Sequence, residues 1–402
     1  MRISTLSFQN NAVTQMQDLQ AAISKTQIQL GTSSRLQSAA DDPAAMVQVN
    51  RLNVELAAST QYVTNGNSAS ANLKLEEQGL SDATATLQSA RDLAVQANSP
   101  TLNATQRQDI ATQLTQQLQD LVSIGNQRDS TGNYLFAGTA SGTLPFVQSS
   151  GSIGYAGASS VNQIQIAANQ RISAGDSGAT AFMNIPAGNG TFTTANAATN
   201  TGTGSIGAGT VTNPAGWVPD TYTISFISPT QYQITNSAGT VVPSGSPPVT
   251  PATFTPGDTI SFNGVQVEIN GTPAATDTFT VAKAGTSSAF NTIQSLITTL
   301  SSPNLSPAQL ATQIGNALQQ IDGAITNMSN VSASVGARLN SITSTQSSSQ
   351  TTQVSLKTAI SDLQDTDYAA AVTELNTQEL ALKAAQQSYA SIAQLSLFNY
   401  IK

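Results

Sequence analysis

Acidic side chains stand out in this chain because only 9% of its residues are charged. The stretch SSRLQSAADDPAA, residues 33–45, carries Arg35 and the adjacent pair Asp41 and Asp42. Two neighbouring carboxylates could bind a metal ion, form an acid/base pair or start a helix. The further oxygen ligands that an EF-hand loop requires are absent. Asp42 before Pro43 instead favours a helix N-cap with proline in the first turn, beside the positive end of the helix dipole.

A second acidic cluster, Asp362, Asp365 and Asp367, lies in SDLQDTDYAAA. It lacks a partner that would separate the pKa values of an acid and a base. We therefore expect a break between two helices, with aspartate capping the second helix. For the adjacent Glu76 and Glu77 we expect a solvated helix face.

The absence of some residue types narrows the chemistry further. The chain of 402 residues has no histidine and no cysteine, which removes the usual zinc sites and the Ser-His and Cys-His nucleophile systems. We expect no catalytic site, no metal and no cofactor. A net charge of −8 without a basic run disfavours nucleic acid. No stretch approaches membrane-spanning length, so no membrane insertion is expected.

Two helical zones must position these clusters. Residues 1 to about 130 and about 287 to 402 are rich in Gln, Ala, Ser and Leu, and each carries narrow apolar stripes at helical spacing. Asn103 with Gln106 and Ser306 with Gln309 are expected capping boxes. The stripes nearest the two ends predict a coiled-coil or assembly seam of Met16, Leu19, Ile23, Leu30, Leu375, Leu382, Tyr389 and Ile392.

The zone between them alternates with the period of β-strands. Asn263-Gly264 separates two alternating runs and predicts a hairpin. An alternative of a different class is a carbohydrate-binding or glycosidase domain. Its stacking platform would be Trp217, Tyr222 and Tyr232, and its carboxylates Asp220, Asp258, Glu268 and Asp277. Because the aromatic residues alternate along strands, packing in a core is the better interpretation.

The expected fold class is therefore α+β and multidomain. Long terminal helices form a coiled-coil or bundle rod, and a β-rich outer domain is inserted between them. Neither helical zone has the aromatic residues for a core of its own, so the two zones should pack on each other.

Three segments together resemble the bacterial flagellin superfamily. They are the N-terminal MRISTLSFQNN, the segment LGTSSRLQSAADDPAA, and the C-terminal run DLQDTDYAAAVTELNTQELALKAAQQSYASIAQLSLFNYIK. The resemblance covers about 140 residues at each end of the chain. The start RISTLSF and the ending QLSLFNYIK are similar to the members at the junction between hook and filament, whereas flagellins usually begin and end differently.

The resemblance implies nested layers. The inner layer would pair terminal helices 1–43 and 362–402, the next would be a helical bundle of 44–140 and 286–361, and the outer would be a β-rich domain, 141–285.

The resemblance also implies a structural role. The chain would form a homo-oligomeric ring that connects hook-associated protein 1 to the flagellin filament. It would lie outside the cell, exported by the flagellar type III apparatus, with an export chaperone bound to its C-terminal helices. A flagellin filament subunit is the alternative within the superfamily.

In this scheme the first acidic stretch becomes a turn between layers. Ser33 and Ser34 follow a helix stop at Gly31, and Asp42-Pro43 starts the next helix. Ser33, Ser34, Arg35, Asp41, Asp42 and Pro43 are then candidates for contacts within the turn or with a neighbouring subunit.

Overall fold

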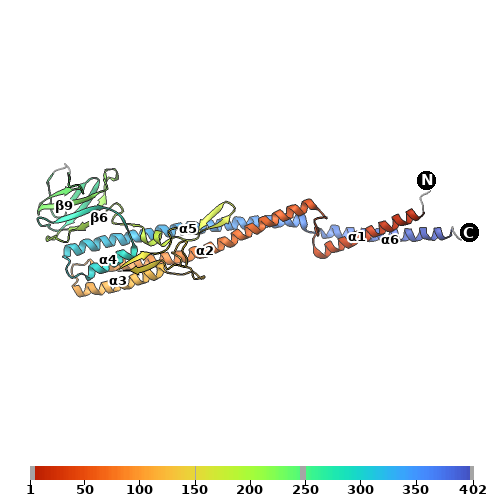
Figure 1. Cartoon of the computed structure of the whole chain (residues 1–402), viewed down its shortest axis with the longest axis horizontal. Helices are drawn as coiled ribbons and strands as arrows, with labels where there is room; N and C mark the ends of the chain where they lie inside the picture. Colours follow the sequence, from red (N-terminus) through yellow and green to blue (C-terminus); the bar gives the residue numbers. More distant parts are fainter. Residues whose placement is uncertain (1–4, 150, 245–249, 399–402) are drawn as a thin grey trace. The chain divides into compact units, whose positions relative to one another are not determined.

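The computed structural model describes residues 5–149, 151–244 and 250–398, without the side chains of residues 5, 6, 8 and 392–398. Its helices are α1 (Thr5–Thr32), α2 (Pro43–Ala97), α3 (Ala104–Gly125), α4 (Ala289–Ser301), α5 (Pro307–Gln364) and α6 (Tyr368–Phe398) (Figure 1). The chain divides into two compact units. Unit 1 comprises residues 1–64 and 345–402, and unit 2 comprises residues 65–344.

The expected helix starts in unit 2 are confirmed. The Asn103 side chain accepts a hydrogen bond from the Gln106 amide at 2.9 Å, and the Gln106 side chain accepts one from the Asn103 amide at 3.0 Å. Ser306 and Gln309 form the same reciprocal pair before α5. Both boxes satisfy amides that a helix start otherwise leaves without partners.

The four helical segments of unit 2 share one apolar core. Leu73, Leu80 and Leu87 of α2 are fully buried, at the spacing of seven that the sequence shows. The same core includes side chains from α3, α4 and α5.

The prediction for Glu76 is wrong. Glu77 is exposed, but Glu76 is only 2% exposed. Glu76 stands three residues after Leu73 and four before Leu80, so the helical repeat places it on the buried face with them.

Residues 146–173 form two hairpins, which we expected to belong to the outer β-domain. They are β1 (Phe146–Ser149) with β2 (Ser152–Tyr155), and β3 (Gln163–Ala167) with β4 (Gln170–Ser173). Their buried side chains belong to the helical core instead: Phe146, Ile153, Ile166 and Ile172. The hairpins therefore extend the bundle, and a π-helical turn, Ala179–Met183, follows them.

The β-domain proper has two sheets. One has the order β11 (Val241–Val242), β10 (Gln231–Thr235), β9 (Thr221–Ser228), β15 (Thr278–Lys283) and β6 (Phe192–Asn196), with β12 (Ala252–Thr253) also on β10. The other has the order β13 (Thr259–Phe262), β14 (Val265–Asn270) and β7 (Ser205–Ile206), with β8 (Thr210–Val211) also on β14. Outside both, β5 (Ile185–Pro186) pairs with β16 (Thr286–Ser287), and a 3₁₀ turn spans Pro214–Gly216.

The Asn263-Gly264 hairpin is confirmed. Phe262 of β13 lies opposite Val265 of β14, so only these two residues form the loop. Both have positive φ, 44° for Asn263 and 74° for Gly264, which is the backbone geometry that a tight two-residue hairpin needs.

Unit 1 contains an antiparallel pair of helices, α1 and α6, which we call the terminal helix pair (Figure 1). The buried Thr26 hydroxyl of α1 donates to the Gln378 side chain of α6 at 3.2 Å. Seven residues later, Ser33 contacts Tyr368 at the start of α6. The partner numbers fall as the α1 numbers rise, as in an antiparallel pair.

Candidate functional site: the joint

Two breaks in the helices of unit 1 meet at one place, which we call the joint. It consists of residues 33–42, between α1 and α2, and residues 365–367, between α5 and α6. The Arg35 amide donates to the Gln364 carbonyl oxygen at 2.7 Å, and the Thr366 amide donates to the Ser33 carbonyl oxygen at 3.1 Å. Backbone hydrogen bonds therefore connect the two linkers directly.

Asp42 is the expected cap of α2. Its Oδ1 accepts a hydrogen bond from the Ala45 amide at 3.0 Å, and its carbonyl oxygen accepts one from Met46 at 3.0 Å. Pro43 is the first residue of the helix. Arg35 lies 3.8 Å from the Asp42 carboxylate, a distance between exposed groups that adds little stability. The other contact of Arg35, to the Leu363 carbonyl oxygen at 2.7 Å, crosses to the end of α5.

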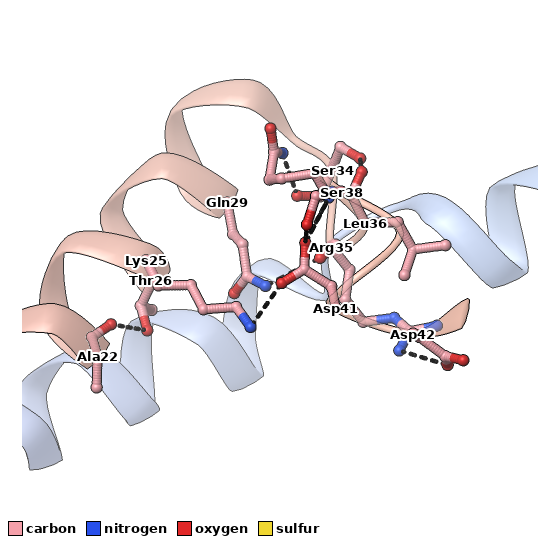
Figure 2. A network of polar contacts seen from close by, with 11 residues as sticks. Ala22, Lys25, Thr26, Gln29, Ser34, Arg35, Leu36, Ser38, Asp41 and Asp42 are labelled. Carbon is pink, nitrogen blue, oxygen red and sulfur yellow. Dashed lines mark hydrogen bonds and ion pairs between the residues drawn. The ribbon is translucent and has the colours of Figure 1, made fainter. Parts of the chain in front are cut away.

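Asp41 organises the linker itself (Figure 2). Its Oδ2 accepts hydrogen bonds from the amides of Gln37 at 3.1 Å and Ser38 at 2.8 Å. Its Oδ1 pairs with Lys25 of α1 at 2.7 Å. The hydrogen bond from Lys25, followed by that from the Ser38 amide, lowers the pKa of Asp41 to about 2. The two adjacent carboxylates thus serve different helices.

The second acidic cluster is the start of α6. Asp367 Oδ1 accepts hydrogen bonds from the amides of Ala369 at 2.9 Å and Ala370 at 3.1 Å, which confirms the expected cap. Asp365 forms a backbone bridge with Ser34, and its carboxylate accepts a hydrogen bond from Ser361. Asp362 is exposed on α5.

Sequence reasoning missed two contributors to the joint. Leu36 is 5% exposed and packs with Ala45 and Val49 of α2 in a small cluster that also contacts Ile360 and Leu363 of α5. The Tyr368 hydroxyl lies 2.5 Å from Ser33 Oγ and donates to the Leu30 carbonyl oxygen at 3.2 Å. An isolated leucine in a polar linker is the one signal that could have indicated this cluster.

The arrangement at the joint is structural in kind. Each carboxylate is engaged by backbone amides, a hydroxyl or a cation, and these contacts stabilise two helix starts and one linker. Among the described residues, no group of three or more His, Cys, Asp or Glu could hold a metal ion.

The predicted seam residues lie along the terminal helix pair. Met16, Leu19, Ile23 and Leu30 of α1 are half-buried, as are Leu375, Leu382 and Tyr389 of α6. Ile392 lies in α6, but its side chain is outside those that the structure describes. The pair alone therefore covers these side chains only in part.

Large apolar side chains are exposed over all four helical segments of unit 1. Three of them are Val54 of α2 at 71%, Leu380 of α6 at 69% and Val354 of α5 at 64%. The others are Val13, Ile28, Val47, Tyr368 and Val372. Among the described residues of unit 1, the small cluster at the joint is the one apolar core. Thinly cored helices with exposed apolar groups are typical of surfaces that bind another protein.

The stacking platform proposed for the β-domain is wrong. Tyr222 and Tyr232 are 2% and 4% exposed and belong to the β-domain core. The half-buried Trp217 packs against Phe192 and Tyr222. These rings therefore fill the core, as the alternation along the strands indicates.

The four carboxylates of that alternative each have different surroundings. Asp277 is buried and accepts hydrogen bonds from the amides of Thr201, Gly202 and Ala274, so it shapes a loop. Asp258 accepts one from the Thr255 amide, and Asp220 from the Thr221 amide. Glu268 is exposed on β14.

No helix among the described residues combines the length and the apolar character that spanning a bilayer requires.

Family models match both ends and part of the middle of the chain. Residues 3–141 match the bacterial flagellin N-terminal helical region, and residues 318–401 match the C-terminal helical region. Residues 194–283 match the D2-like domain of flagellar hook-associated protein 1.

Named relatives agree with these matches. The chain is 32% identical over 185 residues to flagellar hook-associated protein 3 of Salmonella typhimurium, a match that covers 46% of this chain and 58% of the relative. The chain thus aligns with somewhat more than half of that relative's length.

Solved structures extend the similarity. The FlgL structure from Xanthomonas campestris is 32% identical, with a TM-score of 0.71 over 77% of this chain and 99% of that chain. The flagellar hook-associated protein 3 structure from Legionella pneumophila is 29% identical, with a TM-score of 0.73 over 79% and 98%.

Proposed function

Because the chain belongs to the bacterial flagellin family, in the branch of flagellar hook-associated protein 3, we propose that it is a structural subunit of the hook–filament junction. In this role several copies form a ring outside the cell. One side of the ring contacts hook-associated protein 1 and the other contacts flagellin.

One observation carries the proposal: the exposed apolar side chains of unit 1. Val54, Val354 and Leu380 are each more than half exposed, and they lie on helices that share only a small apolar cluster among the described residues of unit 1. Burying one such side chain against another subunit stabilises a contact by about 1.5–3 kcal/mol. Repeated around a ring, these contacts supply the assembly energy that unit 1 lacks by itself.

The joint supports the same role. Its backbone bonds and caps fix where the terminal helix pair begins, so a neighbouring subunit meets a defined surface. We further propose that the residues of the seam on α6 bind an export chaperone before assembly. Export through the flagellar type III channel then delivers the chain to its site.

A gene deletion tests the junction role. A strain without this protein should carry hooks without filaments and release flagellin monomers into the medium, and the gene returned on a plasmid should restore filaments. A strain that keeps normal filaments would contradict the proposal. A strain that loses one filament type and keeps another would indicate the alternative role, a filament subunit.

A further inference from the structure

Glu76 lies on α2 within unit 2 and has a buried carboxyl group. Its Oε1 accepts a hydrogen bond from the Asp176 amide at 2.9 Å, but its Oε2 is buried without a hydrogen-bond partner. Asp176 lies in the segment 174–178, which follows β4. A carboxylate in this position loses its hydration and receives one hydrogen bond in return, which is costly.

The charges around Glu76 do not balance. The Asp176 carboxylate pairs with Arg338 of α5, and both side chains are largely covered, at 21% and 14% exposure. Arg338 also donates to the carbonyl oxygens of Gly175 and Ser334, each at 3.3 Å. Two ionised carboxyl groups beside one guanidinium would leave one unpaired negative charge in a poorly hydrated place.

A cavity of about 130 Å³ lies beside this cluster, and its lining residues include no lysine or arginine that could compensate the negative charge. Its other titratable lining residues, Asp129 and Tyr134, come from the segment after α3. Asp129 accepts hydrogen bonds from the amides of Thr131 at 2.8 Å and Asn133 at 2.9 Å, so it is stabilised as a second carboxylate. One proton on Glu76 would leave Asp176 and Arg338 as a balanced ion pair beside a neutral carboxyl group.

The titration of Glu76 agrees with this charge count. Burial, and then the negative charge of Asp176, raise the pKa of Glu76 to about 8, against the opposing effect of Arg338.

We propose that Glu76 is a proton-dependent switch: its neutral carboxyl group holds segment 174–178 between α2 and α5, and its ionisation loosens that segment. The switch would set how firmly the segment after the β3–β4 hairpin is held against the two long helices of unit 2.

The sign of the pH dependence follows from linkage. When segment 174–178 opens, Glu76 meets water and its pKa returns toward 4.5, whereas in the closed state it is about 8. The closed state is therefore favoured fully below about pH 4.5. It weakens about tenfold per pH unit as the pH rises toward 8, and changes little above that.

Hydrogen exchange of the Asp176 amide in the full chain measures this opening. After correction for intrinsic exchange, protection should fall by up to about tenfold per pH unit between about pH 5 and 8. Glu76→Gln, which cannot ionise, should keep the same protection across the range. Glu77→Gln removes the exposed neighbouring charge and should behave as the wild type.

Other outcomes would overturn the proposal. They are protection that does not change with pH in the wild type, or a pH dependence that Glu76→Gln leaves intact. If Glu76→Gln does not fold, the pH titration of the ¹³C shift of the Glu76 carboxyl in the wild type decides the question. A titration midpoint near the ordinary glutamate pKa of 4.5 would contradict the switch. Protection that depends on added calcium or magnesium at fixed pH would show that a cation, not a proton, balances the charge.

Discussion

The Arg35 amide donates a 2.7 Å hydrogen bond to the carbonyl oxygen of Gln364, although 329 residues separate the two in sequence (364 − 35). Gln364 is the last residue of α5, so its carbonyl has no partner within the helix and needs one outside it. Arg35 supplies that partner from the linker after α1. The end of α5 is thereby fixed to the linker between α1 and α2, which makes the joint a single structural element.

Replacement of Asp42 by alanine should weaken the first turn of α2. The lost N-cap costs about 1 kcal/mol, equivalent to about a fivefold loss of protection at the Ala45 and Met46 amides. Hydrogen exchange measures this loss directly. Asp362→Ala removes an exposed aspartate of α5 and should leave these amides unchanged. If the junction role is correct, Asp42→Ala also lowers incorporation into the hook–filament junction more than the control does.

Acid should loosen the linker through Asp41. Its pKa is lowered from 3.8 to about 2 in the folded chain, so its contribution is present above pH 3.8 and is lost as the pH falls through about 2. Protection of the Ser38 amide against hydrogen exchange should therefore fall in acid with a midpoint near the pKa of Asp41, about 2. Lys25→Gln removes the largest cause of the shift and should move the midpoint upward, toward the ordinary value. An unchanged midpoint in Lys25→Gln would show that Lys25 does not hold the carboxylate.

Local rules made the helix starts and the tight hairpin predictable. Asp42-Pro43, Asn103 with Gln106 and Asn263-Gly264 each act through neighbours within four residues, so the sequence alone contains the whole interaction. The alternation that buries Tyr222 and Tyr232 is equally local.

Contacts that depend on distant segments were not predictable in the same way. The spacing to Leu73 and Leu80 places Glu76 on the buried face of α2, but no residue near it in sequence indicates that Asp176 and Arg338 are its neighbours. The hairpins of residues 146–173 have the same alternation as the outer strands. Their alternation indicates that one face of each hairpin is buried, but it does not indicate whether that face packs on the helical core or on the β-domain core.

Replacement of Leu380 by aspartate tests the assembly surface of unit 1. Leu380 is 69% exposed, so the isolated chain should keep its circular dichroism and its unfolding free energy within about 0.5 kcal/mol. Junction formation should nevertheless fail, because a charge would enter a buried subunit contact. Asn376→Asp adds the same charge at an exposed polar position of α6 and should assemble normally.

Leu382→Asp tests the proposed chaperone contact on the same helix. Leu382 is half-buried in the terminal helix pair, and the charge should abolish chaperone binding and secretion while the β-domain stays folded. Pull-down with the purified chaperone and the amount of chain in the medium measure the two effects. Undiminished secretion would contradict a chaperone site at this position.

Packing around Gly125 should be sensitive to added side-chain volume. A methyl group at Gly125, the last residue of α3, would come within 2.7 Å of Phe146 Cδ2 and 3.3 Å of Phe290 Cζ. Phe146 cannot easily move, because Phe182 and Phe290 enclose its ring at centroid distances of 5.3 and 4.7 Å. Gly125→Ala should therefore destabilise the chain by about 1–3 kcal/mol in urea unfolding.

The matched control is Gly336→Ala in α5. A methyl group there has no other atom within 4 Å, and alanine favours the helix, so this variant should be stabilised by about 0.5–1 kcal/mol. The two variants make the same chemical change in helices of one unit. Changes of opposite sign in the unfolding free energy would mean that contact with Phe146, and not helix propensity, determines the destabilisation at Gly125. Equal effects would contradict the tight packing of α3 on the β1–β2 hairpin.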